Sequence, residues 1–140
     1  MTDDRSMPFQ ELCALYYRAD VMFVTSLRDG MNLVSFEFIA CQKKKQGGVL
    51  VLSEFAGAAQ ALGAGALLVN PYNTDEVASA LHKALNMQQA QREERFKYMY
   101  EHVTTHTAQA WAEKFVSSLK YAQQDSVEGA DYGAPQRAGT

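Results

Sequence analysis

Three short apolar runs impose the strongest constraint on how this chain can fold. They cover residues 21–24, 49–52 and 66–69, and none shows the polar alternation of a half-exposed strand. Parallel strands that are covered on both faces have this composition. A turn-rich segment and then a helical pattern follow each run. The sequence therefore predicts an α/β fold, with a three-stranded parallel sheet flanked by helices.

Helical patterns fill the intervals between these runs and continue beyond them. We expect helices over residues 8–18, 33–43 and 56–62, another from residue 74, one over about 89–103 and a last one from residue 107. Asn73 is placed to cap the helix that starts at residue 74, with Glu76 three residues further on as in a capping box.

The small number of strands bears on domain organisation. Mixed α/β domains generally have about five or six strands, so three indicate the C-terminal half of a doubly wound domain, here over residues 1–122. Beyond Ala122 the chain is rich in Gln, Ser, Asp, Gly and Pro without a period. We expect a disordered tail over residues 123–140.

The charge balance excludes some classes of partner. The chain of 140 residues has a net charge of −3, which argues against nucleic acid and anionic membrane surfaces as partners. No apolar run approaches the ~20 residues of a membrane span. Lys43, Lys44 and Lys45 are interpreted as a solvated helix end. Cys13 and Cys41 are interpreted as free thiols in a reducing compartment, which predicts a cytoplasmic protein.

The turn after the first apolar run is the best candidate for a ligand site, because parallel sheets bind ligands at the carboxyl ends of their strands. Gly30 permits a close approach or a positive φ. Asn32 is a good N-cap, so the amides of Leu33 to Ser35 are expected to be unpaired and suited to a diphosphate. Asp29 offers a charged acceptor for two sugar hydroxyls. An ordinary polar turn remains the alternative for this segment.

Glu37 lies one turn into the following helix, and helical side chains lean toward the N-terminus. Its carboxylate can reach a ligand and bind the two hydroxyls of a ribose. Alternatively, Glu37 only complements the helix dipole from the first turn. The pattern alone does not distinguish these two interpretations.

Other residues give weaker signals. His102 and His106 have a metal-ligand spacing but no evident third ligand, so surface histidines are the preferred interpretation and no metal is expected. Ser53 and Glu54 lack a histidine partner and a strained elbow. Trp111, Phe115 and Leu119 form an apolar stripe interpreted as core or interdomain packing, part of which could be left exposed. The glycines interpreted as turn or close-packing positions are Gly57, Gly63 and Gly65.

Several stretches resemble the trehalose-6-phosphate synthases, glycosyltransferase family 20. Residues 20–38 read DVMFVTSLRDGMNLVSFEF, residues 48–60 read GVLVLSEFAGAAQ, and residues 68–73 read LVNPYN. Residues 106–112, HTAQAWA, fit the closing helix of that family. The resemblance covers about residues 8–121, and its details are similar to the plant-type forms, which often carry a phosphatase-like domain afterwards.

The resemblance implies a GT-B fold, in which this chain is the C-terminal half of the second Rossmann-like domain. It implies transfer of glucose from UDP-glucose to glucose 6-phosphate, with retention of configuration and without a metal or other cofactor. Asp29 would be catalytic and take the glucose hydroxyls, the amides around Leu33 and Val34 would hold the diphosphate, and Glu37 would take the ribose hydroxyls. The implied donor-binding residues are Asp29, Gly30, Met31, Asn32, Leu33, Val34, Ser35, Phe36 and Glu37.

The family residues that bind glucose 6-phosphate, and the Arg and Lys that clamp the donor phosphates, precede the matching stretch. We therefore expect UDP-glucose to be the ligand of this chain, glucose 6-phosphate to bind only through the N-terminal part, and the isolated 140 residues to be inactive. Synthase or phosphatase subunits are conceivable partners. The alternative function is a noncatalytic regulatory or interaction subunit of a trehalose synthase complex, and a generic α/β binding module is the third hypothesis.

Overall fold

The computed structural model describes residues 7–45 and 47–130. It contains two compact units that divide after Thr104, and each is described by itself. The elements are α1 (Phe9–Arg18), β1 (Val21–Val24), α2 (Leu33–Cys41), the 3-10 helix η1 (Gln42–Lys44), β2 (Val49–Ser53), α3 (Ala58–Leu62), β3 (Leu67–Val69), α4 (Thr74–Leu85), α5 (Gln89–Thr105) and α6 (Ala108–Ala130).

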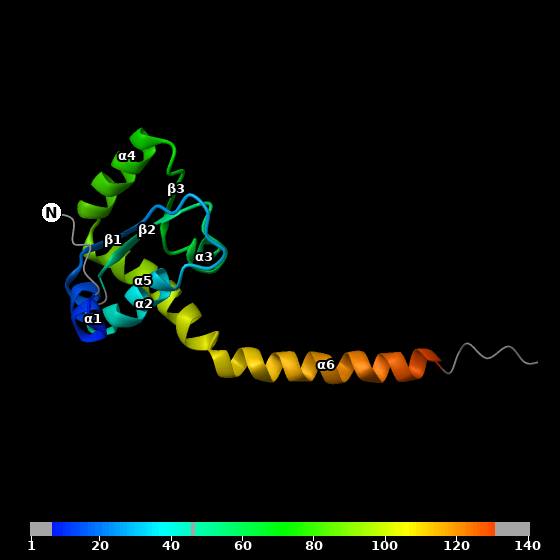
Figure 1. Cartoon of the computed structure of the whole chain (residues 1–140). Coiled ribbons are helices and arrows are strands. Elements are labelled where there is room, and N and C mark those ends of the chain that lie inside the picture. The colour runs from blue at the N-terminus through cyan, green and yellow to red at the C-terminus, as the bar shows by residue number, and fades with distance from the viewer. Residues whose placement is uncertain (1–6, 46, 131–140) are drawn as a thin grey trace, which may run out of the picture. The chain divides into compact units, whose positions relative to one another are not determined.

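The first unit is built on a three-stranded sheet in the order β1-β2-β3 (Figure 1). Both pairings are parallel, with Val21 opposite Val49 and Val51 opposite Leu67. The predicted fold class is thereby confirmed. The apolar runs identified the strands to within one residue at each end, because strands covered on both faces leave few positions for polar side chains.

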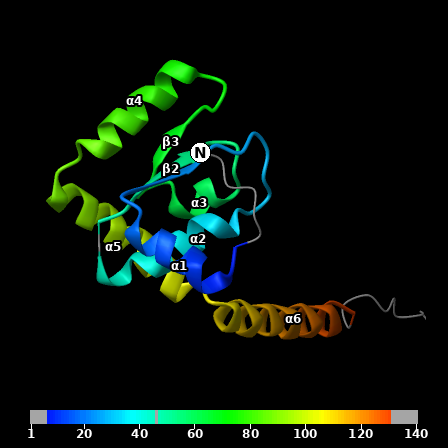
Figure 2. The same ribbon diagram turned by 60° about the vertical axis from the view of Figure 1, so that its left-hand side comes forward.

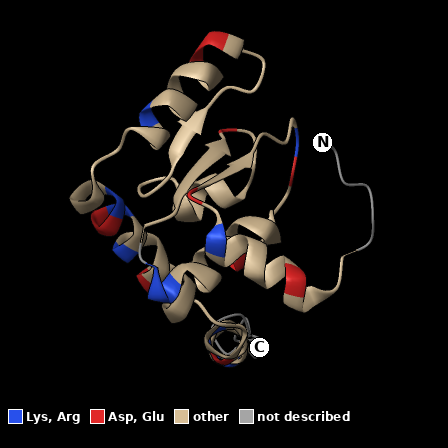
Figure 3. Cartoon of the chain, turned by 90° about the vertical axis from the view of Figure 1, so that its left-hand side faces the viewer, with Lys and Arg blue, Asp and Glu red and all other residues tan. Residues whose placement is uncertain are grey.

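The central strand β2 is buried along its whole length. Leu50 and Leu52 belong to a core with residues of α1, α2, α3 and α5, whereas Val49 and Val51 belong to a second core with Ala84 of α4. Successive strand residues point to opposite faces, so β2 joins the two cores. Figure 2 shows α4 on one side of the sheet and α1, α2 and α3 on the other. The strands carry no charged residue, and charges lie on helices and loops (Figure 3).

Two helices of this unit begin at asparagine caps. The Asn32 side chain accepts a hydrogen bond from the Ser35 amide at the start of α2, and the Asn73 side chain accepts one from the Glu76 amide at the start of α4. Both caps match the sequence predictions. The expected helix over 33–43 ends its α-helical part at Cys41 and continues as η1, and the helix expected from residue 56 begins at Ala58.

The C-terminal end of α1 is held by side chains from the α2–η1 segment, which runs from Leu33 to Lys45, the residue that caps η1. The Gln42 amide donates to the carbonyls of Tyr16 at 2.6 Å and of Ala19 at 2.9 Å. The Lys45 ammonium donates to the Ala19 carbonyl at 3.1 Å and to Asp20 Oδ1 at 2.6 Å. This hydrogen bond with Lys45 holds the pKa of the Asp20 carboxyl below its ordinary value. Lys45 is therefore not the merely solvated residue that the sequence suggested.

The second unit contains α6, whose first turn is capped by Thr107: its hydroxyl accepts from the Ala110 amide at 3.2 Å. The rings of Trp111 and Phe115 stack with centroids 5.4 Å apart, and both side chains are exposed. The helix continues to Ala130, through the first part of the tail expected over residues 123–140. Residues 122–128 contain no Gly or Pro to stop a helix. Residues 131–140 lie outside the described part.

Within residues 7–45 and 47–130, no helix combines the length and the apolar character that crossing a lipid bilayer requires.

Replacement of Gln42 tests the clamp on α1. Gln42→Met keeps the volume of this fully buried side chain but removes the donor to the Tyr16 carbonyl and leaves the Ala19 carbonyl with Lys45 alone. We expect the free energy of unfolding in urea to fall by about 1–2 kcal/mol, since loss of the unpaired buried Oε1 offsets part of the cost. Lys44→Met, at an exposed neighbouring position, is the control. Equal stability of the two variants would contradict the clamp.

Candidate functional site

The segment after β1 lies at the carboxyl ends of the strands and is joined to the segment after β2. The Asp29 carbonyl accepts a hydrogen bond from the Gly57 amide at 2.8 Å, and Asp29 and Ala56 form an isolated parallel bridge. The bridge places Ala56 in an extended pairing, which explains why α3 begins two residues later than expected. The predicted site residues from Asp29 to Asn32 therefore lie on a turn that is fixed to the sheet edge by backbone pairing, and those from Leu33 to Glu37 lie on α2.

Two glycines face each other in this junction. A Cβ atom at Gly57 would lie 1.9 Å from the Gly30 carbonyl oxygen, although the φ of −58° at Gly57 is accessible to any residue. Gly57 is thus a close-packing glycine, as the sequence suggested. At Gly30 a Cβ would meet nothing within 4 Å, and its φ lies outside the left-handed region. Of the two alternatives considered for Gly30, the left-handed φ is therefore excluded, and the space beside the residue is open.

Hydrogen bonds inside the turn fix the carboxylate of Asp29. Its Oδ1 accepts from the Met31 amide at 3.1 Å and its Oδ2 from the Asn32 side-chain amide at 3.0 Å. A carboxylate has about four lone-pair positions, so each oxygen keeps one for a ligand hydroxyl. The turn is organised before any ligand arrives.

The helix N-terminus differs in one respect from the expectation. The Ser35 amide is not unpaired, because Asn32 Oδ1 accepts from it at 2.9 Å and also from the Ser35 hydroxyl at 2.9 Å. Ser35 is buried, and Phe36 packs against the core. Because the Ser35 amide is taken, the amides of Leu33 and Val34 remain as the candidates for binding a diphosphate. The side chains of Met31 and Leu33 are exposed.

Glu37 lies on α2 where this helix packs against α1. The hydroxyl of Tyr16 donates to Glu37 Oε2 at 3.3 Å, and Tyr16 is itself buried. Burial and the neighbouring Glu37 charge raise the pKa of the Tyr16 hydroxyl above its ordinary value. No sequence motif marks Tyr16 as part of the site; the available signal is that a buried tyrosine usually has a hydrogen-bond partner.

The two cysteines lie near this pair and are free thiols, as expected. Burial raises the pKa of the Cys41 thiol, and so does its hydrogen bond with the Cys13 side chain. A raised pKa keeps the thiol protonated at neutral pH, and a protonated thiol is a poor nucleophile. Cys41 therefore does not resemble an activated catalytic thiol.

The weaker candidates do not form a second site. Ser53 is fully buried, and its hydroxyl accepts from the Phe55 amide at 3.1 Å. His102 lies in α5, whereas His106 follows the end of that helix at Thr105. Across residues 7–45 and 47–130, no three or more His, Cys, Asp or Glu side chains are grouped to hold a metal ion.

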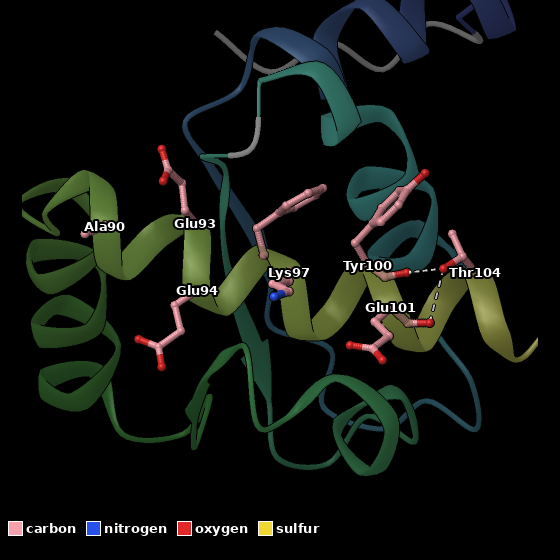
Figure 4. A pocket seen from close by; sticks show the side chains of 8 residues that line it. Ala90, Glu93, Glu94, Lys97, Tyr100, Glu101 and Thr104 are labelled. Carbon is pink, nitrogen blue, oxygen red and sulfur yellow. Dashed lines mark hydrogen bonds between the residues drawn. The ribbon is translucent and has the colours of Figure 1, made fainter.

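An open groove of about 840 Å³ runs along α5, outside the predicted site. Figure 4 shows the side chains that line it, among them Glu93, Glu94 and Glu101, with Lys97 and Tyr100 between them. The Lys43 ammonium lies 5.9 Å from the centre of the Tyr100 ring. One helix supplies all the lining residues, three of them acidic, so this surface does not suit an anionic ligand such as a nucleotide.

A parallel sheet with a structured turn at the carboxyl ends of its strands is the architecture of Rossmann-like nucleotide-binding domains. The model of glycosyltransferase family 20 matches residues 3–121. The chain belongs to glycosyltransferase family 20.

Known proteins of this family are similar over most of the chain. It is 65% identical over 116 residues to an alpha,alpha-trehalose-phosphate synthase (UDP-forming) of Arabidopsis thaliana, covering 83% of this chain and 12% of the relative. A structure described as trehalose-6-phosphate from E. coli bound with UDP-2-fluoro glucose matches with a TM-score of 0.77 at 46% identity, over 83% of this chain and 26% of the other.

A Burkholderia xenovorans alpha,alpha-trehalose-phosphate synthase in complex with glucose-6-phosphate matches with a TM-score of 0.77 at 43% identity, over 83% of this chain and 26% of the other. The chain thus spans about an eighth of the Arabidopsis relative and about a quarter of the solved chains.

The glycine pair offers a matched test of the turn. Gly57→Ala forces a Cβ against the Gly30 carbonyl, and we expect the free energy of unfolding in urea to fall by about 1–3 kcal/mol through overpacking. Gly30→Ala meets open space and should stay within about 0.5 kcal/mol of the unsubstituted chain. An unchanged stability of Gly57→Ala would show that the two segments are not held in contact.

The raised pKa of Tyr16 predicts an alkaline loss of stability. Above pH ~10 the unfolded chain loses this proton while the folded chain keeps it. This pKa difference contributes to the free energy of unfolding. The contribution is fully present below the pKa of Tyr16 in the unfolded chain and is lost as the pH rises through its pKa in the folded chain. We expect the free energy of unfolding to fall by up to ~1.4 kcal/mol per pH unit more than in Tyr16→Phe. Identical pH dependence of the two proteins, with Tyr17→Phe as control, would exclude the effect.

Proposed function

We propose that this segment binds the sugar nucleotide in a retaining glucosyltransferase that forms trehalose 6-phosphate and UDP from UDP-glucose and glucose 6-phosphate. The observation that carries the proposal is the turn of Asp29 to Asn32, which is fixed before ligand binding and opens beside the N-terminus of α2. Membership of glycosyltransferase family 20 supports the reaction class.

The diphosphate of the donor is proposed to lie at the N-terminus of α2. The first amides of a helix lack intrahelical partners and point outward at the positive end of the dipole. Asn32 takes the Ser35 amide, so the amides of Leu33 and Val34 are the donors assigned to the phosphate oxygens. The charge on the departing diphosphate increases as the glycosidic bond breaks, and fixed donors stabilise that charge without rearrangement.

The glucose is proposed to contact the turn itself. Asp29 accepts the sugar hydroxyls with the lone pairs that Met31 and Asn32 leave available. The open space beside Gly30 permits the ring to approach the backbone. A charged acceptor makes hydrogen bonds that are shorter and stronger than those of a neutral one. Asp29 is therefore assigned to hold the glucose in the orientation needed for transfer.

Glu37 is proposed to bind the ribose hydroxyls. Its carboxylate is half-buried and already accepts a hydrogen bond from Tyr16, which a residue that only complements the helix dipole does not require. The ribose interpretation is therefore preferred over the dipole interpretation. No metal is assigned a role, since the proposed charge stabilisation comes from amides.

The acceptor side is proposed to come from outside this segment. The E. coli structure is described as bound with UDP-2-fluoro glucose, and the Burkholderia xenovorans synthase is in complex with glucose-6-phosphate. Because the chain spans only a part of such proteins, we assign it the donor side alone. A noncatalytic regulatory subunit is the less favoured alternative, because it would not need the turn and Glu37 to be organised together.

Calorimetric titration with UDP and UDP-glucose tests the proposal. We expect weak binding of both ligands. Glu37→Ala should weaken both about tenfold or more, the loss that follows when a charged hydrogen-bond partner is removed. Asp29→Ala should lower the affinity for UDP-glucose more than that for UDP, because its ligand is the sugar.

Glu94→Ala serves as the matched control, since it removes an exposed carboxylate of α5 far from the turn in the sequence. It should leave both affinities unchanged. Absence of heat at millimolar UDP, with the chain shown to be folded, would overturn the donor-site proposal.

A further inference from the structure

Tyr16 brings a side chain from outside the turn into contact with the proposed ribose carboxylate. It lies on α1, 21 positions before Glu37, and its hydroxyl donates to Glu37 Oε2 at 3.3 Å. Only 7% of the residue is exposed, and its ring belongs to the core that includes Val24 and Phe38. The hydroxyl is therefore held at one position by the packing of the ring.

The backbone of Tyr16 is fixed as well. Its carbonyl accepts from the amide of Gln42, which is fully buried and lies directly after α2. Lys45 donates to the carbonyls of Arg18 and Ala19 at the end of α1. These bonds tie α1 to the α2–η1 segment that carries Glu37. Movement of one helix relative to the other would break several hydrogen bonds together.

The contact restricts the Glu37 side chain, which otherwise rotates about three bonds. Immobilising such a side chain at the moment of binding reduces affinity, and a ligand group that is already oriented avoids this cost. A carboxylate has about four lone-pair positions, and the Tyr16 bond uses one on Oε2. The remaining positions can accept two neighbouring hydroxyls of a ribose.

We propose that Tyr16 is a positioning residue that orients the Glu37 carboxylate for the two ribose hydroxyls of the nucleotide. The inference rests on the proposed function, because it requires Glu37 to bind that ribose. Tyr16 touches no ligand in this account and acts through Glu37. The neutral hydroxyl suits this role, since it remains a hydrogen-bond donor to the carboxylate at neutral pH.

The test is Tyr16→Phe, which keeps the buried ring and removes the hydroxyl. The full chain is titrated by calorimetry with UDP and with 2′,3′-dideoxy-UDP, which lacks the two ribose hydroxyls. We expect the variant to bind UDP about three- to tenfold more weakly and to bind the dideoxy nucleotide as the unsubstituted chain does. In the Glu37→Ala background, Tyr16→Phe should have no further effect on UDP.

Tyr17→Phe is the matched control, because this neighbouring residue of α1 is 41% exposed. It should leave both affinities unchanged. If the unsubstituted chain binds UDP and Tyr16→Phe binds it equally well, the positioning role is overturned while the donor site stands. If Tyr16→Phe weakens both nucleotides equally, the residue is merely structural. If the unsubstituted chain binds neither nucleotide, the donor site fails and this inference fails with it.

Discussion

Burial of β2 on both faces is the constraint on which the rest of the structure depends. Leu50 and Leu52 face the core of α1, α2, α3 and α5, while Val49 and Val51 face that of α4. Full burial of such a side chain contributes about 1.5–3 kcal/mol, and a one-residue shift in register would move each set of side chains into the opposite core. The parallel partners β1 and β3 then end at the same edge, which is where the candidate site lies.

The turn after β1 takes its position from this edge. The bond from the Gly57 amide to the Asp29 carbonyl connects it to the segment after β2, and the absence of a Cβ at Gly57 permits the contact. Asn32 then starts α2, and α2 carries Glu37 back against Tyr16 of α1. The residues assigned to the sugar, the diphosphate and the ribose thus all lie between Asp29 and Glu37. The strand, the turn and the packing of α2 on α1 fix their positions.

Much of this could be predicted from the sequence. The strands are evident because they are apolar throughout, and Asn32 and Asn73 mark helix starts because their side chains suit the cap. Contacts between distant segments could not be predicted. The pairing of Asp29 with Ala56 delays the start of α3, and Asn32 takes the Ser35 amide that was expected to be free. The contact of Tyr16 with Glu37 joins two helices, and no periodicity reports it. The polar composition beyond Ala122 does not reveal that α6 extends to Ala130, and the tail over residues 123–140 stays a prediction.

The central claim is that the turn and the start of α2 form the nucleotide site, in preference to the groove along α5. The most direct measurement is a titration of the ¹⁵N-labelled chain with UDP, followed by amide chemical shifts in NMR spectra. We expect the shift changes to concentrate in residues 29–37 and at Gly57, and the amides of Glu93 to Thr104 to stay unchanged. Shifts that concentrate along α5, or that spread evenly over the folded chain, would contradict it.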